Sequence, residues 1–278
     1  MKILISADLE GIAGLADPDA MGVRGSQYLT AQRLMTEEVN AAIEGALSAG
    51  ATQIVVVDAH GRGRNLLSEL LHPGAELVQG SIRPLRMMQE LDGSFDGVFF
   101  VGYHAMAGTS QGVLNHTLMG YEIQDLSLNA EPAGEIRLNA GLAGSFGVPV
   151  LLLTGDAQTI AEGKALLGDI ETAVVKTGLD RYTARSLHPT VARDRIREAA
   201  TRAIRQRACA RPYVIAPPVT LTIRFASTTL AAVADYVPGV RVEGPRTVSY
   251  TTHHYPELLE IYAALSMLAR QVSDAVYG

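Results

Sequence analysis

The sequence predicts an α/β fold, in which a mostly parallel sheet is flanked by helices and followed by a smaller C-terminal α+β subdomain. Three apolar runs of strand length, residues 2–7, 54–57 and 98–101, each lead into polar residues and alternate with helical patterns. Continuous apolar runs are typical of strands that are buried on both faces. The alternation of strands and helices indicates βαβ units, whose strands are parallel.

The first half of the chain supports this pattern element by element. Apolar residues recur at helical spacing over residues 28–49, and Gly50 supplies a C-cap. After the second strand, capping signals predict short helices over residues 65–71 and 84–91. The third strand leads into an irregular stretch, residues 105–115, rich in Gly, Ser and Thr. Such a loop suits the wall or lid of a site.

The next elements continue the alternation. Glu135 follows a turn and starts a helix, and residues 148–153 form another apolar strand. Asp156 comes directly after Gly155, and we interpret it as the N-cap of a helix that runs from about Thr159.

The texture of the sequence changes after about residue 176. The remaining elements are predicted to be a helix over residues 189–207, a strand over 219–225, a helix over 228–236, a strand over 240–250 and a final helix from residue 256. We therefore expect two units, residues 1–180 and residues 181–278.

Composition excludes several classes of protein. The formal net charge of −6 lacks the basic excess of a nucleic-acid binder, and no run of Lys and Arg offers a phosphate-tracking surface. No apolar stretch approaches the roughly 20 residues of a membrane span, and Asp8 interrupts any signal-peptide core. A single cysteine, Cys209, rules out an intrachain disulfide and fits a reducing compartment. We expect a cytoplasmic protein with a small or peptidic partner and no membrane or nucleic-acid partner.

Polar residues with metal-binding side chains gather at the predicted strand ends. Asp8 and Glu10 lie two residues apart and would point to one face, where their charges repel unless a cation lies between them. His60 and His104 follow the next two strands, and Glu135 starts the helix beyond. Mixed carboxylates and imidazoles suit hydrolytic Zn²⁺ or Mn²⁺. Five such ligands are too many for one catalytic zinc, so we predict two ions with Asp8 bridging them.

Three further features belong to the same region. Asp58 could be a ligand, but we favour a supporting role in which it accepts a hydrogen bond from an imidazole. His116 follows the irregular loop, and we interpret it as a general acid/base or a stabiliser of the transition state rather than a ligand. Arg62 and Arg64 lie in a turn that lacks the ending of a phosphate loop, although they could instead meet a substrate carboxylate.

This set of motifs resembles the zinc-dependent D-aminopeptidase family, the type linked to bacterial dipeptide-transport operons. The motifs that carry the resemblance are residues 6–11, 35–38, 58–60, 102–105, 115–116, 134–135 and 155–156. One departure lies in the loop before His116, which is one residue longer than the family pattern and has Asn115 where serine is usual. This departure bears on substrate preference rather than on the metal chemistry.

The resemblance implies a dinuclear zinc enzyme that removes N-terminal residues, D-amino acids in particular, from short peptides. Its two ions per subunit would be bound by Asp8, Glu10, His60, His104 and Glu135, with His116 as the catalytic histidine. Residues 1–180 would form the catalytic domain, and residues 181–278 would serve assembly. The family also implies a self-compartmentalising homo-oligomeric ring, a decamer, with its sites facing an inner chamber.

Two other functions remain open at this stage. The Asp58-x-His60 pair is also found in metal-dependent phosphoesterases, although the chain lacks their Gly-Asn-His stretch and a clustered His-x-His. A non-catalytic peptide- or sugar-binding module could use the same carboxylates to hold a structural ion.

Overall fold

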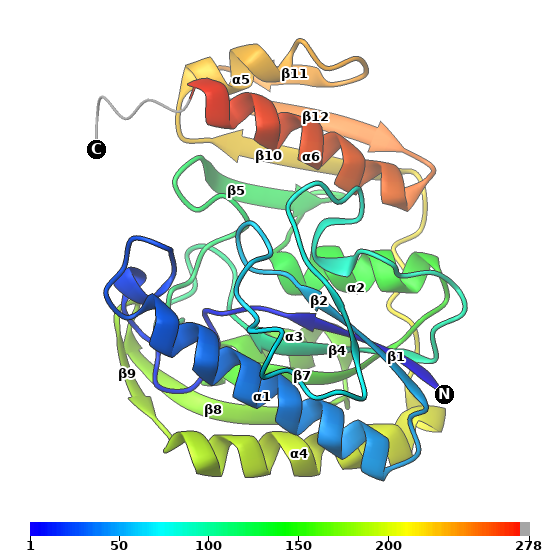
Figure 1. Cartoon of the computed structure of the whole chain (residues 1–278). Helices are drawn as coiled ribbons and strands as arrows, with labels where there is room; N and C mark the ends of the chain where they lie inside the picture. The colour runs from blue at the N-terminus through cyan, green and yellow to red at the C-terminus, as the bar shows by residue number, and fades with distance from the viewer. Residues whose placement is uncertain (273–278) are drawn as a thin grey trace.

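The computed structural model describes residues 1–272, which form two β-sheets with helices between and around them (Figure 1). Within these residues the larger sheet has seven strands in the order β3-β2-β1-β4-β7-β8-β9. They are β1 (Lys2–Ala7), β2 (Gln53–Asp58), β3 (Glu76–Val78), β4 (Gly97–Tyr103), β7 (Val150–Asp156), β8 (Glu171–Asp180) and β9 (Thr183–Ser186). All neighbouring strands are parallel except β8 and β9. The predicted α/β fold with a mostly parallel sheet is confirmed.

The first strand lies in the middle of this sheet, between β2 and β4. Ala7, the last residue of β1, is opposite Asp58 on one side and Val101 on the other. The chain runs outward from β1 to β2 and β3, and then returns to β4 on the other side of β1. Such a reversal of strand order opens a crevice at the carboxyl ends of the strands, where α/β proteins bind their ligands.

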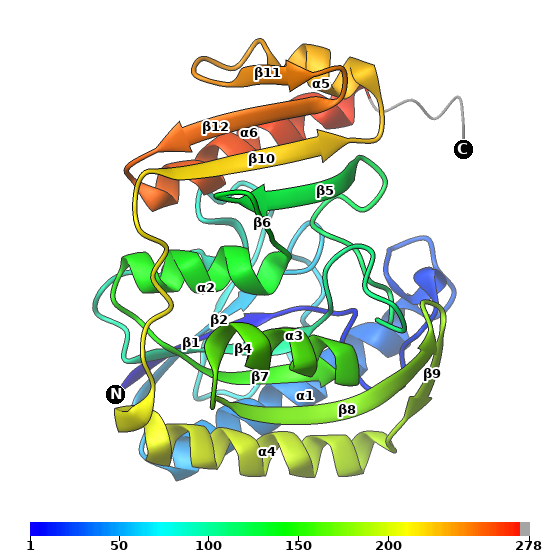
Figure 2. The same cartoon turned by 180° about the vertical axis from the view of Figure 1, so that it is seen from behind.

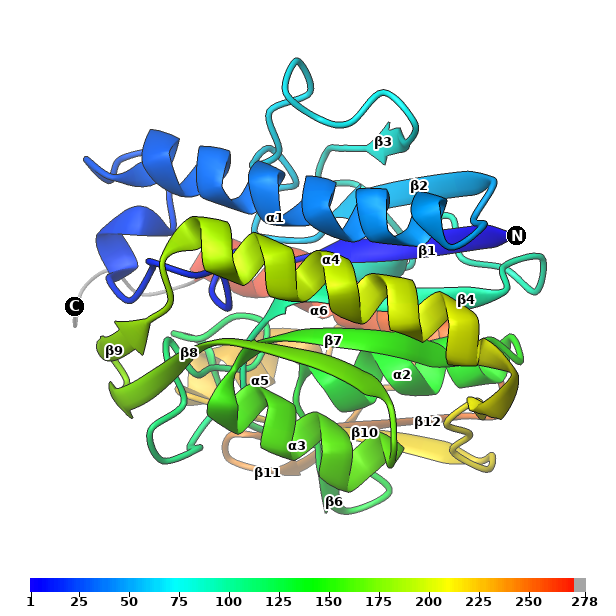
Figure 3. The same cartoon turned by 90° about the horizontal axis from the view of Figure 1, so that it is seen from below.

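Helices cover both faces of the larger sheet, which explains the continuous apolar runs. Ile3 and Ile5 point into the core with α1 and α4, whereas Leu4 belongs to the core on the opposite face. The helices α1 and α4 lie side by side on the first face (Figure 3), and α2 and α3 lie on the second (Figure 2). Their bounds are α1 (Tyr28–Ser48), α2 (Glu135–Ser145), α3 (Ala157–Leu167) and α4 (Pro189–Gln206).

The second sheet is antiparallel and lies beyond α2, as Figures 1 and 2 show from opposite sides. Its order is β11-β12-β10-β5-β6, and α6 packs between β12 and α2. The elements are β5 (Ile123–Leu128), β6 (Glu131–Pro132), β10 (Val219–Phe225), α5 (Thr228–Ala234), β11 (Arg241–Gly244), β12 (Thr247–Thr252) and α6 (Tyr255–Val272). Because β5 pairs with β10, this sheet joins segments from both sides of residue 180. The predicted division into units 1–180 and 181–278 stays a prediction.

Three local predictions were wrong. Residues 65–71 form turns rather than a helix, because the side chain of Asn65 donates to Asp58 and to the His60 carbonyl instead of capping a helix. Residues 84–91 contain only the short 3₁₀ helix η2 (Arg86–Met88), since Glu90 is among the residues with a positive φ. The run 240–250 is a hairpin of β11 and β12 rather than one strand.

The remaining short elements are the 3₁₀ helices η1 (Pro18–Ala20) and η3 (Arg207–Cys209). Of the helices in the described range, none combines the length and the apolar character needed to cross a membrane.

Candidate metal centre

The loop after β1 and the C-terminal end of β4 approach each other closely because two glycines leave room. The Gly11 N–H donates to the Gly102 carbonyl at 2.8 Å, and a Cβ atom on Gly11 would lie 2.0 Å from the Tyr103 carbonyl oxygen. Gly102 has a φ of +71°, and a Cβ there would lie 2.3 Å from the Asp8 carbonyl oxygen. The backbone segments that carry Asp8, Glu10 and His104 are thus in direct contact.

Asp8 lies at the centre of the resulting cluster. Its Oδ1 atom is 3.4 Å from Nδ1 of His60, and its Oδ2 atom is 3.5 Å from Nε2 of His104. Glu10 lies on the His60 side, with Oε2 3.0 Å from Nδ1 of that ring. Glu135, at the first turn of α2, lies on the other side, with Oε1 3.2 Å from Nε2 of His104. The structure therefore brings together all five residues predicted as metal ligands.

The three histidines of the site are oriented in the same way, because one nitrogen of each ring faces a backbone carbonyl. His60 Nε2 is 2.8 Å from the Met21 carbonyl, His104 Nδ1 is 3.0 Å from the Ala105 carbonyl, and His116 Nδ1 is 2.9 Å from the Leu114 carbonyl. When those nitrogens donate, the other nitrogen of each ring presents its lone pair to the carboxylates. Metal-binding histidines are commonly fixed in this manner.

The electrostatics of the cluster are set by several titratable groups that are buried close together. Burial and the neighbouring Glu10 carboxylate raise the pKa of Asp8 to about 7. Burial alone would lower the pKa of His60 and of His104, but the facing carboxylates raise both pKa values well above the ordinary range. Asp8 Oδ2 and His104 Nε2 are buried and have no hydrogen-bond partner among the described residues. Two facing orphan ligand atoms of this kind fit a metal ion.

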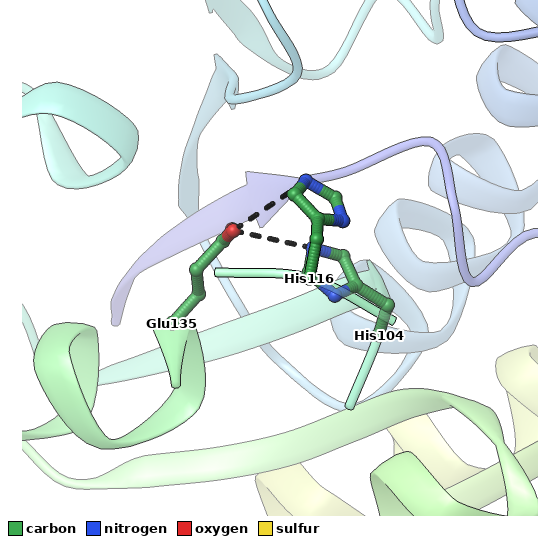
Figure 4. A group of neighbouring side chains, drawn as sticks. All are labelled: His104, His116 and Glu135. Atoms are coloured by element: carbon green, nitrogen blue, oxygen red, sulfur yellow. Dashed lines mark ion pairs between the residues drawn. The ribbon is translucent and has the colours of Figure 1, made fainter. Parts of the chain in front are cut away.

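His116 lies beside these residues, and Figure 4 shows its ring against that of His104 with Glu135 facing both. The two imidazole rings are stacked with centroids 4.1 Å apart. His116 Nε2 is 3.9 Å from Glu10 Oε1 and 3.9 Å from Glu135 Oε1. Burial and the His104 charge lower the pKa of His116. His116 is thus adjacent to the cluster. It is also close enough to bind a metal ion together with His104 and Glu135.

Asp58 supports His60 indirectly, and the predicted hydrogen bond from an imidazole to its carboxylate is not formed. Its carboxylate accepts hydrogen bonds from the Asn65 backbone and side chain and from the Leu66 N–H. The Asn65 side chain also donates to the His60 carbonyl at 2.7 Å. Asp58 therefore holds the loop that carries His60, and the ring itself contacts Glu10 and Met21.

The loop before His116 is fixed at several points. Asp156 caps α3 through the N–H groups of Gln158 and Thr159, which confirms its predicted role, and its second oxygen accepts from the Val113 N–H at 3.1 Å. Asn115 donates to carbonyls within the loop, those of Thr109 and Gly112. The residue that departs from the family pattern thus shapes this wall of the site.

Sequence reasoning missed Lys176, which is 1% exposed in the middle of β8. Its ammonium group donates to the carbonyls of Glu10, Ile12 and Leu15. These three bonds hold the loop that follows β1 and position Glu10. The available signal was a lysine inside an otherwise apolar strand pattern.

The cluster opens into a pocket of about 120 Å³. Besides the site residues it is lined by Arg83, Arg86, Met87, Tyr262 and Arg270. Arg62 and Arg64, by contrast, are exposed on the neighbouring turn.

Buried carboxylates and imidazoles at the switch point of a parallel sheet define the class, an α/β metallohydrolase. A model of the family described as D-aminopeptidase matches residues 1–264, so the chain belongs to the D-aminopeptidase family. It is 34% identical to a D-aminopeptidase of Bacillus subtilis (strain 168) over 269 residues, 96% of each chain. Its structure is similar to that of the Zn-dependent D-aminopeptidase DppA from Bacillus subtilis, described as a self-compartmentalizing protease, with a TM-score of 0.95 and 33% identity over 99% of this chain and 100% of the other. The predicted family and enzyme class are confirmed.

Proposed function

We propose that the chain is a dinuclear zinc aminopeptidase that removes N-terminal residues, D-amino acids in particular, from short peptides. The position of Asp8 carries the proposal, because its two oxygens face two different histidines, His60 and His104. A carboxylate shared in this way suits two ions about 3.5–4 Å apart. The preference for D-residues is supported by the names of the family and of its Bacillus subtilis member.

Each ion would have its own set of ligands around the shared carboxylate. Glu10 and His60 would complete one set, and His104 and Glu135 the other. Ligand atoms bound to zinc at about 2.0–2.2 Å lie roughly 3.3–3.6 Å apart in a tetrahedral site. The contacts of 3.0–3.5 Å within the cluster are close to that spacing. Bound zinc would supply a hydroxide near neutral pH and would polarise the scissile carbonyl.

His116 is proposed to move the proton. With Nδ1–H donating to the Leu114 carbonyl, Nε2 is free to accept a proton from the attacking water and return it to the leaving amine. Burial favours the neutral form of the ring, which is the form that accepts a proton. The cationic α-amino group of the substrate would be attracted to the acidic residues of the pocket, which favours cleavage at the N-terminus.

The proposal is tested with zinc-reconstituted protein. We expect about two zinc ions per chain, hydrolysis of D-dipeptides faster than of their L-counterparts, and no turnover of an aryl phosphate. Turnover of the aryl phosphate alone would identify a phosphoesterase. Bound metal without turnover of either substrate would identify a binding module.

We further propose a cytoplasmic homo-oligomeric ring, a decamer in which the sites face an inner chamber. The self-compartmentalizing DppA supports the ring, and the single cysteine, which is exposed and unpaired, supports a reducing compartment. Light scattering should give ten times the chain mass of 29.6 kDa. A monomer mass would contradict the ring.

A further inference from the structure

The pocket beside the metal centre contains arginines that the proposed metal chemistry does not use. Arg83 and Arg86 line it from the segment between β3 and β4, and Arg270 lines it from the last turn of α6. No ion pair between described residues joins these guanidinium groups to the carboxylates of the cluster. One pocket therefore presents acidic ligands and, beyond ion-pair distance, a basic group of residues.

Arg83 is buried in a way that calls for an anionic neighbour. Its side chain is 8% exposed, and its Nη1 donates to the Asp58 carbonyl. Its Nε is buried without a hydrogen-bond partner among the described residues. The nearby Asp58 carboxylate already accepts three hydrogen bonds from Asn65 and Leu66. A guanidinium buried to this extent is costly without an anionic neighbour, and Arg83 is among the residues that line the pocket.

Arg86 is held in a fixed position at the same pocket. Its φ of 54° is unusual for a residue with a side chain, and such backbone is found mainly where the surrounding structure enforces it. The buried residues Met87 and Met88 anchor the segment that follows. The guanidinium carbon lies 5.3 Å from the centroid of the Tyr262 ring, a cation–π contact that orients the planar group.

We propose that Arg86, assisted by Arg83 and Arg270, binds the C-terminal carboxylate of a short peptide whose N-terminal residue lies at the metal centre. This inference rests on the proposed aminopeptidase function and narrows its substrates to dipeptides with a free carboxylate. Planar guanidinium groups bind carboxylates through paired, charge-assisted hydrogen bonds. The arginines would thus recognise the C-terminal carboxylate, which lies on the far side of the scissile bond from the N-terminal residue.

The arrangement of the pocket agrees with this substrate class. In a dipeptide, the terminal carboxylate carbon lies roughly 3–4 Å beyond the scissile carbonyl carbon, about one residue along the chain. Because metal ligands and arginines line one pocket, a dipeptide bound at the metal centre has its carboxylate in the pocket that the arginines line. Because Arg270 comes from α6, the second sheet and its helices complete a pocket whose metal ligands all belong to the first 135 residues.

The kinetic test compares a D-dipeptide with the same dipeptide as its C-terminal amide. Wild-type enzyme should prefer the free acid, and Arg86→Gln should lower kcat/KM for the acid by about 10- to 100-fold while changing that for the amide less than about threefold. Arg86→Lys, which keeps the charge without the planar fork, should recover part of the loss. Arg241→Gln removes the same charge from the exposed strand β11 and should leave kcat/KM unchanged for both substrates.

A binding measurement keeps the inference independent of turnover. Calorimetry on zinc-loaded protein uses the dipeptide with its scissile amide reduced to a methyleneamine, as the acid and as the carboxamide. The acid should bind at least tenfold tighter, and Arg86→Gln should abolish the difference. If wild-type protein hydrolyses neither dipeptide yet shows this difference, the aminopeptidase proposal fails and the carboxylate site stands. The inference is overturned if wild-type protein binds the two analogues equally. It is also overturned if Arg86→Gln lowers kcat/KM equally for acid and amide, or if Arg62→Gln, rather than Arg86→Gln, selectively lowers kcat/KM for the acid.

Discussion

Asp8 and His104 face each other across the point where the strand order of the sheet reverses, with Oδ2 3.5 Å from Nε2. Both atoms are buried, and neither has a hydrogen-bond partner in the described part of the chain. In a site that binds no metal, such a pair would destabilise the fold by several kcal/mol, roughly the cost of two unsatisfied buried groups. In a metal centre it is the expected arrangement of two ligands that have been positioned in advance.

Metal removal should abolish activity while lowering the melting temperature only modestly. Four of the five proposed ligands follow strands of a sheet that is covered on both faces, and Glu135 starts α2, so the core holds them without the ion. Small zinc-dependent folds behave differently, because their metal binding and folding are one process. Dialysis against a chelator, followed by calorimetry and zinc add-back, checks this. Complete unfolding of the apoprotein would assign the metal a structural role.

His116→Ala should keep near-full zinc content while kcat falls by roughly 10²–10⁴-fold, the scale expected for losing a positioned acid/base group. The structure makes this variant informative, since His116 also lies within reach of a metal shared with His104 and Glu135. If His116 were a ligand, zinc content would fall with activity. Metal analysis, steady-state kinetics and thermal unfolding on the same preparation separate the roles, and retained activity contradicts the catalytic assignment.

Gly11→Ala should destabilise the protein by about 3 kcal/mol and weaken zinc binding, because the added Cβ would lie 2.0 Å from the Tyr103 carbonyl oxygen and push the two ligand loops apart. Gly244→Ala is the matched control, since a Cβ there meets nothing within 4 Å. Urea unfolding and zinc titration of both variants provide the measurement. Wild-type zinc affinity in Gly11→Ala would show that the close approach of the loops is not needed for the site.

The buried Glu38 should make stability fall as pH rises from about 4.5 to about 7. Burial raises its pKa from 4.5 to about 7, against the opposing hydrogen bond from the Ala13 N–H. The folded protein therefore binds the proton more tightly than the unfolded chain. Stability from this group is fully present below the unfolded pKa and is lost as pH rises through the folded one, a change of about 3 kcal/mol.

Glu38→Gln keeps an acceptor for the Ala13 N–H but cannot ionise, so it should flatten this part of the stability profile. Urea unfolding of zinc-saturated wild type and variant at pH 5 and pH 7.5 isolates the difference. A slope that is unchanged in Glu38→Gln means that Glu38 does not titrate in this range.

The features of the site that the sequence predicts correctly are those with a local signal. Strand ends could be located because apolar runs stop at Asp8, His60 and His104, and Asp156 could be assigned as a cap because an N-cap depends on its own helix. Local signals fail where a polar side chain binds a partner outside its own segment. The residues around Asn65 predict a helix cap, but its side chain donates to Asp58 and to the His60 carbonyl instead.

The sequence by itself determined the parallel sheet, the strands that carry the proposed metal ligands and the chemical type of those residues, because the hydrophobic period and the side-chain inventory are properties of short segments. Only the tertiary structure decided that β5 pairs with β10, that Lys176 holds the Glu10 loop, and that Arg86 and Arg270 share a pocket with Asp8. These relationships join residues far apart in the chain. They are set by packing and by the need to satisfy buried polar groups, which no local pattern encodes.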